Sequence, residues 1–374
     1  DAAVSQVGND NFANVIRQTA NGNDVPNQPN IDATAVILQN GSDNFATIAQ
    51  DAVPNNATIT QNGDENDATI TQTAANATAT VTQTQVESGN GIRIRGADGR
   101  DNTAPNQSIR SNFSNIVQSA VNTRAEVTQK GDLNRSEVLQ TGTGGAAAEV
   151  SQTGIFNNSQ IDQEGDGFAK VTQGGLYGDN NSQITQTANG ASATVTQNSG
   201  STTEPTLFPT NESIIQQDDE AQATVTQEGQ QNKSLIDQFV GANGAVAEVK
   251  QTNSVGSLEE DTNLSTITQR AESSAYVEQI GQGNTSDVKQ IGANIAPGNG
   301  LLFAVDVRQL GDDSESTVTQ NGMGNEAKLL QAAGSSNNVS TITQDANDSF
   351  ADVLQAGSGN DSLVEQMSGS GNTA

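Results

Sequence analysis

The sequence predicts an all-β protein, a β-solenoid of about 14 two-strand rungs stacked into two facing parallel sheets with uncapped ends. Three observations predict it. A pattern of small residue, any residue, Val or Ile, any residue and Gln recurs in 28 copies. The copies alternate between two kinds, so the true unit contains two copies. Within a copy the special residues occupy every second position, which is the period of a β-strand.

Each copy reads as one strand followed by one turn. Residues 157–163 form a typical strand, and residues 164–167 form a turn-like segment of the kind that often carries Gly. Strand, turn, strand and turn complete one rung. At about 4.8 Å per rung, the array predicts a rod roughly 67 Å long.

Copies in odd places carry Ala four residues before the Gln, as at Ala125. Copies in even places, the first of which is assigned to Gln18, mostly carry Ser there, as at Ser136, and Asn six residues before the Gln. The alternation persists from Gln6 to Gln366, which predicts one repeat array over residues 1–366 and a tail over 367–374. Five longer connections interrupt the array, near residues 19–31, 84–111, 198–210, 252–262 and 291–302.

The composition of the chain limits the classes of function that it can have. The net charge is -29, aromatic residues make up 3%, and Cys and His are both absent. These values exclude a disulfide framework and argue against an enzyme, a cofactor and a nucleic-acid partner. The chain contains no run of 18 apolar residues, so no membrane insertion is expected. Because it opens at Asp1 without a leader, we expect a mature form from which a signal peptide has been removed.

The inward Gln residues are expected to be structural. In parallel stacked strands, each amide can donate to one neighbour and accept from the other, which avoids the cost of burying unpaired polar groups. We therefore predict a core ladder that includes Gln129, Gln140, Gln152, Gln163, Gln173, Gln186 and Gln197.

The pattern Asn, any, Ala or Ser, any, Ile or Val, any, Gln, followed by a short Gly-containing turn, is clear in residues 61–72. It resembles the curlin repeat of bacterial curli fibres. The resemblance implies a secreted, extracellular subunit of a cross-β functional amyloid in biofilm matrix or on the cell surface. It also implies export through an outer-membrane channel and the possible use of a nucleator.

Both ends of the array lack a visible cap, and an uncapped rung exposes unpaired backbone groups. The expected self-assembly ends are Ala2, Val4 and Gln6 on one side, and Asn360, Ser362, Val364 and Gln366 on the other. The first strand is of the odd kind and the last of the even kind, so the sequence predicts a head-to-tail homopolymer that continues the alternation. A Pro at Val4 or Val364 is expected to block one end.

Other functions fit the sequence less well. Outward Thr-x-Thr pairs resemble an ice-binding surface, but Glu and Lys interrupt them on intervening rungs. Acidic clusters could bind Ca²⁺, although their spacing matches no known calcium loop; the weak candidates are Asp218, Asp219, Glu220, Glu259, Glu260 and Asp261. The alternative function is a rod-like surface adhesin or spacer whose inserted loops bind a partner.

Overall fold

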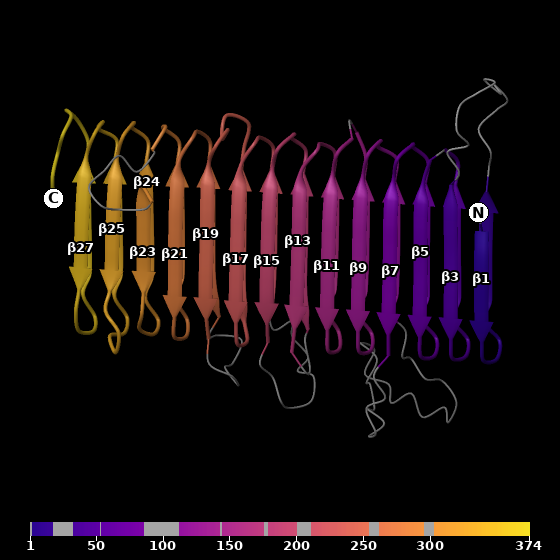
Figure 1. The fold of residues 1–374 in the computed structure, drawn as a ribbon. Coiled ribbons are helices and arrows are strands. Elements are labelled where there is room, and N and C mark those ends of the chain that lie inside the picture. Colours follow the sequence, from indigo (N-terminus) through magenta and orange to yellow (C-terminus); the bar gives the residue numbers. More distant parts are fainter. Residues whose placement is uncertain are drawn as a thin grey trace, which may run out of the picture.

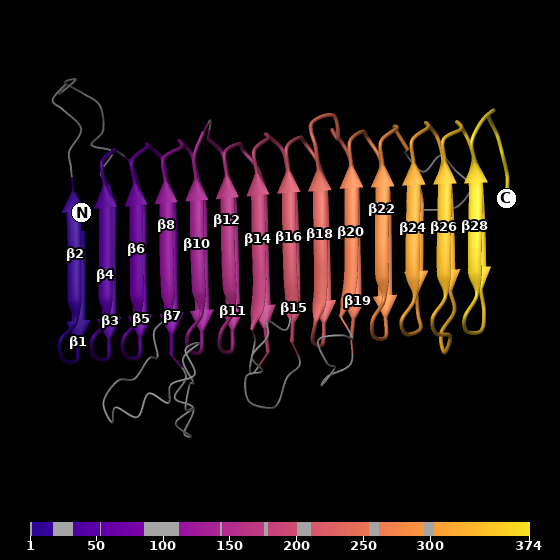
Figure 2. The ribbon, with the colours of Figure 1, turned by 180° about the vertical axis from the view of Figure 1, so that it is seen from behind.

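The computed structural model describes residues 2–17, 33–52, 54–85, 112–142, 144–175, 179–199, 211–253, 262–294 and 303–374. They form 28 strands in two parallel sheets of 14, with one sheet in front of the other (Figures 1 and 2). The chain alternates between the sheets, so each contains every second strand. This confirms the predicted solenoid. Within the described residues there is no helix, and therefore none long and apolar enough to cross a bilayer.

The odd sheet faces the reader in Figure 1. Its strands are β1 (Ala2–Val7), β3 (Thr34–Asn40), β5 (Asn56–Asn62), β7 (Thr78–Thr84), β9 (Arg124–Lys130), β11 (Ala147–Thr153), β13 (Phe168–Gly174), β15 (Ser192–Asn198), β17 (Gln222–Glu228), β19 (Val246–Thr252), β21 (Ser274–Ile280), β23 (Val305–Gln309), β25 (Glu326–Gln331) and β27 (Phe350–Gln355).

The even sheet faces the reader in Figure 2. Its strands are β2 (Phe12–Arg17), β4 (Phe45–Gln50), β6 (Asp67–Gln72), β8 (Phe113–Gln118), β10 (Arg135–Gln140), β12 (Asn158–Gln163), β14 (Asn180–Gln186), β16 (Asn211–Gln217), β18 (Asn232–Gln238), β20 (Asn263–Gln269), β22 (Thr285–Gln290), β24 (Glu315–Gln320), β26 (Val339–Gln344) and β28 (Asp361–Gln366).

Identical columns of the repeat lie in register along each sheet. In the pair β11 and β13, for example, Val150 lies opposite Val171 and Gln152 opposite Gln173. A slip of one residue would turn every inward side chain outward, so the buried columns fix this register.

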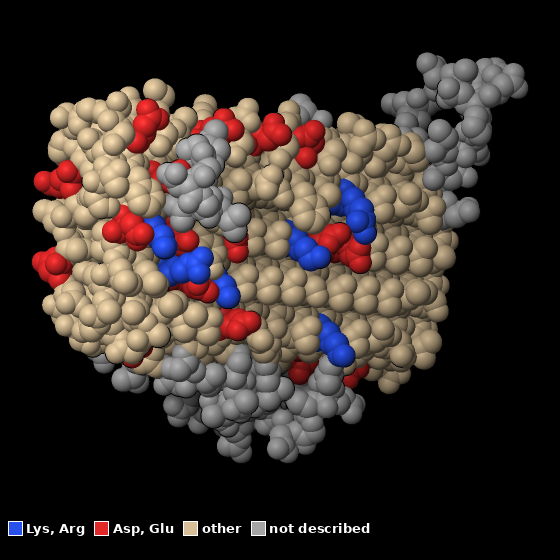
Figure 3. Space-filling model, turned by 60° about the vertical axis from the view of Figure 1, so that its left-hand side comes forward, with Lys and Arg blue, Asp and Glu red and all other residues tan. Residues whose placement is uncertain are grey.

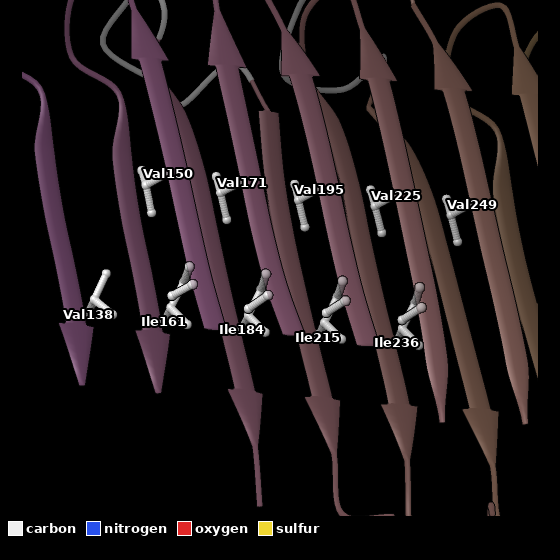
Figure 4. Packing of buried hydrophobic residues seen from close by; sticks show 14 of the residues in the cluster. Val138, Val150, Ile161, Val171, Ile184, Val195, Ile215, Val225, Ile236 and Val249 are labelled. Carbon is white, nitrogen blue, oxygen red and sulfur yellow. The ribbon is translucent and has the colours of Figure 1, made fainter. Parts of the chain in front are cut away.

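The core is a narrow double row of aliphatic side chains. Val150 and Val171 of the odd sheet face Ile161 and Ile184 of the even sheet, and the same arrangement repeats along the stack (Figure 4). Ile161 and Ile184 are fully buried. Each such side chain contributes about 1.5 to 3 kcal/mol by leaving water, which explains how a chain poor in large apolar residues acquires a continuous core.

Many turns after odd strands contain a glycine, and the turn after β9 shows why. At Gly131 φ is 121°, and an added Cβ would lie 2.0 Å from the carbonyl oxygen of Gly154 in the next rung. Two residues later, Leu133 adopts a left-handed conformation, with φ of 57°. At this turn the close approach of the next rung therefore requires glycine at the first position, whereas the third position accepts a non-glycine residue in the left-handed conformation.

The second strand, β2, lies one residue away from its predicted register. The backbone pairs Arg17 with Gln50 and Val15 with Ile48, so Arg17 occupies the place assigned to Gln18. Gln18 itself lies outside the described residues. The assignment of Gln18 to the repeating Gln column is therefore wrong.

Two contacts explain this register. The ring of Phe12 stacks on that of Phe45, with centroids 4.8 Å apart. The amide of Asn44 donates from Nδ2 to Oδ1 of Asn11 at 3.1 Å. Residues 11–17 therefore repeat the pattern of residues 44–50, with Asn first and Ala third.

Residues 367–374, expected as a tail, continue the fold in part. Isolated parallel bridges join Asn347 to Ser370 and Phe350 to Thr373. These residues begin a further odd strand beside β27. The five long connections of the array lie largely outside the described residues.

Candidate functional site

Three ladders of side-chain amides run along the core and end at the two ends of the stack. In the odd sheet, Gln Nε2 donates to Gln Oε1 of the next rung from Gln6 to Gln309. In the even sheet, the same bonds run without interruption from Gln50 to Gln366. All are 2.7 to 3.0 Å long.

The seven Gln residues expected in one ladder divide between these two. Gln129, Gln152, Gln173 and Gln197 lie in the odd sheet, and Gln140, Gln163 and Gln186 in the even sheet; all are buried. The amides also close the turns that follow them. Gln61 Nε2, for example, donates to the carbonyl oxygens of Phe45 and Asn66 at 2.9 and 3.0 Å. Each ladder therefore holds successive rungs together and ties the two sheets at a corner.

A third ladder, of Asn residues, runs in the opposite sense. From Asn11 to Asn263, Nδ2 of each Asn donates to Oδ1 of the Asn in the preceding rung, at 2.9 to 3.2 Å. The Gln ladders therefore present donors toward the C-terminal end of the stack, and the Asn ladder presents an acceptor there. The sequence pattern placed these residues inward but did not indicate their opposite polarity.

The N-terminal end of the stack is open. All described residues of β1 are exposed, with Val4 51% accessible although the other residues of its column are buried. The carbonyl of Val7 accepts a bond from the backbone N–H of Gly41, which directly follows β3, at 2.9 Å. Because successive residues of a strand point their backbone groups in opposite directions, Ala2, Val4 and Gln6 point theirs away from β3. The inward residues of β1 thus form a free edge.

The C-terminal end presents the complementary set of backbone groups. The carbonyl of Gln366 accepts a bond from the N–H of Asp345 beside β26, at 2.9 Å. By the same alternation, the backbone of Val364 points to β26, and the backbone of Leu363 faces the open edge. The expectation that Pro at Val364 would block only the free edge is therefore corrected, because that substitution removes a bond inside the stack.

Amides at the two ends also complement each other. Gln355 Nε2 donates to the carbonyls of Val339 and Asn360 but, among the described residues, has no further Gln to meet. At the other end, Gln6 donates to Gln39 at 2.7 Å, and no described residue donates to its Oε1. The odd Gln ladder therefore ends in a donor on one side and an acceptor on the other.

The Asn ladder ends with the opposite pairing. Asn360 Nδ2 donates to Asn338 Oδ1 at 3.1 Å, and its own Oδ1 faces the C-terminal end. Asn11 Nδ2 donates to the carbonyl of Gly41 at 2.7 Å, as Asn44 does to Gly63 one rung further along. Ser362, the remaining predicted end residue, donates a 2.9 Å bond to the Ser340 hydroxyl. A second stack placed in register would extend both ladders.

The outer face of the odd sheet carries opposite charges on neighbouring positions (Figure 3). Arg124 and Lys170 flank Glu149, both at 3.4 Å, and Lys250 lies 3.3 Å from Glu278. These pairs are exposed and contribute at most about 1 kcal/mol each. They neutralise the face locally and do not form a charged binding surface.

The acidic metal candidates do not converge. Asp218 Oδ1 accepts a 3.1 Å bond from the Thr187 hydroxyl, and Asp219 accepts from the backbone N–H groups of Glu220 and Gly241. Within the described part of the chain, no group of three or more acidic residues is placed to hold a metal ion. Glu259, Glu260 and Asp261 lie outside the described residues.

Two ladders are interrupted near the C-terminal end. Gln309 Nε2 donates to the carbonyls of Thr285 and Ser314, and Oε1 of Gln331 has no hydrogen-bond partner. In the Asn column, Ser314 takes the place between Asn284 and Asn338. It has no side-chain amide, so it cannot form the amide-to-amide bonds of the ladder. The junction of β23 and β24 with β25 and β26 therefore has fewer side-chain ladder bonds than the junction that joins the last two rungs.

Replacing Ser314 with Asn should repair the Asn column. The new amide would lie between Asn284 and Asn338, and we expect the free energy of unfolding to rise by about 1 kcal/mol, the net value of one added buried hydrogen bond. Thermal denaturation and amide hydrogen exchange over residues 305–344 measure the effect. The Ser314→Ala variant, which adds no amide, is the control, and a Ser314→Asn variant no more stable than Ser314→Ala would contradict the proposed repair.

Burial raises the pKa of Asp179 from 3.8 to about 6. Burial also raises the pKa of Asp67, Asp162 and Asp237, with Glu164 adding to the rise at Asp162 and Asp218 to that at Asp237. Because the folded state then binds protons more tightly than the unfolded state, stability increases as pH falls from about 7 toward 4.

The Asp179→Asn variant tests whether the buried Asp179 carboxylate destabilises the folded chain at neutral pH. It should be more stable than the natural chain at pH 7, by about 1 kcal/mol since the carboxyl group keeps partial contact with water, and the difference should vanish near pH 4. Urea denaturation at both pH values measures it. A difference that is the same at pH 7 and pH 4 would show that burial of the charge is not its cause.

The family model for the curlin associated repeat matches two stretches of the chain, residues 55–84 and 346–374. The first stretch contains β5, β6 and β7, and the second contains β27, β28 and the residues that pair with β27. No curated protein matches the chain. The chain therefore carries curlin associated repeats, at places where the structure shows rungs of the solenoid.

Proposed function

We propose that this chain is the structural subunit of an extracellular, curli-like cross-β filament that assembles head to tail. The observation that carries the proposal is the complementarity of the two ends. At one end the inward backbone groups of β1 and β2 point out of the stack, and at the other the outward backbone groups of β27 and β28 do, those of Phe350 and Asp352 being bonded to residues 372–374. The odd Gln ladder and the Asn ladder each end in a donor on one side and an acceptor on the other.

Placed in register, a second copy would pair its β1 with β27 of the first. Val4 would lie opposite Val353, and Gln355 Nε2 would donate to Gln6 Oε1. Asn11 Nδ2 would donate to Asn360 Oδ1. Such an interface joins two different surfaces, so it generates an open filament rather than a closed dimer.

The even Gln ladder would not continue across this junction. In the corrected register, position 17 of the second copy would pair with Gln366, and arginine, unlike glutamine, has no acceptor for the Gln366 amide. We infer that the odd Gln ladder and the Asn ladder align the two copies, and that the even sheet contributes mainly backbone bonds.

The charge of the chain supports an extracellular fibre in biofilm matrix or on the cell surface. A net charge of -29 keeps separate subunits soluble, and it weakens association when the ionic strength is low or the pH is high. Lower pH protonates carboxylates and so removes part of this repulsion. Protonation of the buried Asp residues with raised pKa also stabilises the folded subunit at lower pH. Assembly should therefore be faster near pH 4 than at pH 7.

Negative-stain microscopy of the purified chain at both pH values, with fibre diffraction, tests the function. We expect long unbranched fibres that form faster at higher protein concentration, with a spacing of about 4.8 Å along the fibre axis. Fibres from the pure chain would also show that no nucleator is required. A chain that stays monomeric at all concentrations would contradict the proposal and favour an adhesin or spacer.

A further inference from the structure

Residues 371–374 lie along β27 as the start of a further odd strand. The backbone N–H of Phe350 donates to the carbonyl of Asn372 at 2.7 Å, and the N–H of Ala374 donates to the carbonyl of Phe350 at 3.0 Å. The N–H of Asp352 donates to the carbonyl of Ala374 at 3.0 Å. We call residues 371–374 the strap.

The strap covers the first half of the edge that an incoming copy needs. Thr373 pairs with Phe350, so Ala374 lies beside Ala351. In the head-to-tail junction that place belongs to Ala2 of the incoming copy. The two strands cannot occupy it together.

The inward residue that the strap covers is buried, whereas its counterpart at the other end of the stack is exposed. Ala351 of β27, which lies beside Ala374, is fully buried. Ala2, in the corresponding column of β1, is exposed. Leu354, the next outward residue beyond the strap, remains 66% accessible.

We propose that the strap is an autoinhibitory contact that must leave β27 before each subunit is added. The inference rests on the proposed function, because it concerns the same end of the stack. The strap is part of the chain, so it competes with an incoming β1 at a high effective concentration. The edge next to Leu354 stays free, and an incoming strand can pair there first and then displace the strap.

Seeded elongation measures this directly. Preformed fibres of the natural chain are mixed with fluorescent subunits of four kinds: the natural chain, a variant that ends at Gly371, Ala374→Pro and Thr373→Pro. Ala374→Pro removes the N–H that donates to Phe350. Thr373→Pro is the matched control, because the bonds to Phe350 come from the residues on either side of Thr373.

We expect the shortened variant and Ala374→Pro to elongate fibres about tenfold faster than the natural chain, the factor that corresponds to about 1.4 kcal/mol or roughly one net hydrogen bond. Thr373→Pro should elongate at the natural rate. Equal rates for all four chains would overturn the strap and leave the fibre proposal standing. If the natural chain forms no fibres to serve as seeds, the fibre proposal fails and the strap inference fails with it.

Discussion

Replacing Gln186 with Ala should lower the free energy of unfolding by about 3 kcal/mol. Gln186 accepts a 2.8 Å bond from Gln163, donates a 2.8 Å bond to Gln217 and donates to the carbonyl of Phe168 at 3.1 Å. The substitution would leave the buried amides of Gln163 and Gln217 each without one partner and would open a cavity.

The neighbouring Gln216 supplies the control. It lies on β16 one residue before Gln217, and its side chain is exposed. Gln216→Ala should change the free energy of unfolding by less than about 0.5 kcal/mol. Urea and thermal denaturation of both variants measure the difference. Equal stability of the two would mean that the amide ladder does not hold the rungs together.

Replacing Val4 with Pro should slow fibre elongation at least about tenfold and leave the subunit folded. The N–H of Val4 points away from β3, so Pro removes no bond inside the stack. In the filament that N–H would bond to β27 of the neighbouring copy, and Pro would remove the bond and place its ring against the partner strand.

Two further variants distinguish the loss of the Val4 N–H from the loss of its side chain and from damage to the subunit itself. Val4→Ala reduces the side chain and keeps the N–H, so it should elongate faster than Val4→Pro. Ala3→Pro removes an N–H that points to β3, so it should disturb the first rung of the subunit itself. Seeded elongation and the thermal midpoint of unassembled subunits are measured together. Normal fibre growth by Val4→Pro would contradict pairing through this edge.

At the C-terminal end, the proline substitution that tests the free edge should be made at Leu363 and not at Val364. The sequence pattern marks Val364 as an inward residue, which is correct, but it does not indicate which neighbouring strand its backbone faces. That direction follows from the bond between Asp345 N–H and the Gln366 carbonyl. Leu363→Pro should therefore block the free edge, and Val364→Pro should weaken the pairing of β28 with β26.

The repeating columns made the fold predictable from sequence. Ala, Val or Ile, and Gln recur at fixed spacing, and only a parallel stack places like residues of successive rungs side by side. The register of β2 was missed because Val15 and Ile16 are adjacent aliphatic residues, so either could fill the core. The match between residues 11–17 and residues 44–50 was the signal that separates the two registers.

The end structures were less predictable. The opposite polarity of the Gln and Asn ladders depends on which amide atom faces each neighbour, and a residue pattern carries no such information. The strap was missed because Asn372, Thr373 and Ala374 contain only the first three residues of a repeat. They lack the Val and Gln positions by which the repeat is detected.

The mass per length of the fibres tests the central claim most directly. A subunit of 38.5 kDa that spans roughly 67 Å of the fibre axis predicts about 5.7 kDa per nanometre for a single filament, or whole multiples of it for bundles. Scanning transmission microscopy of unstained fibres measures this quantity. A value near 80 kDa per nanometre, which one chain per layer of about 4.8 Å would give, would contradict end-to-end stacking of intact solenoids.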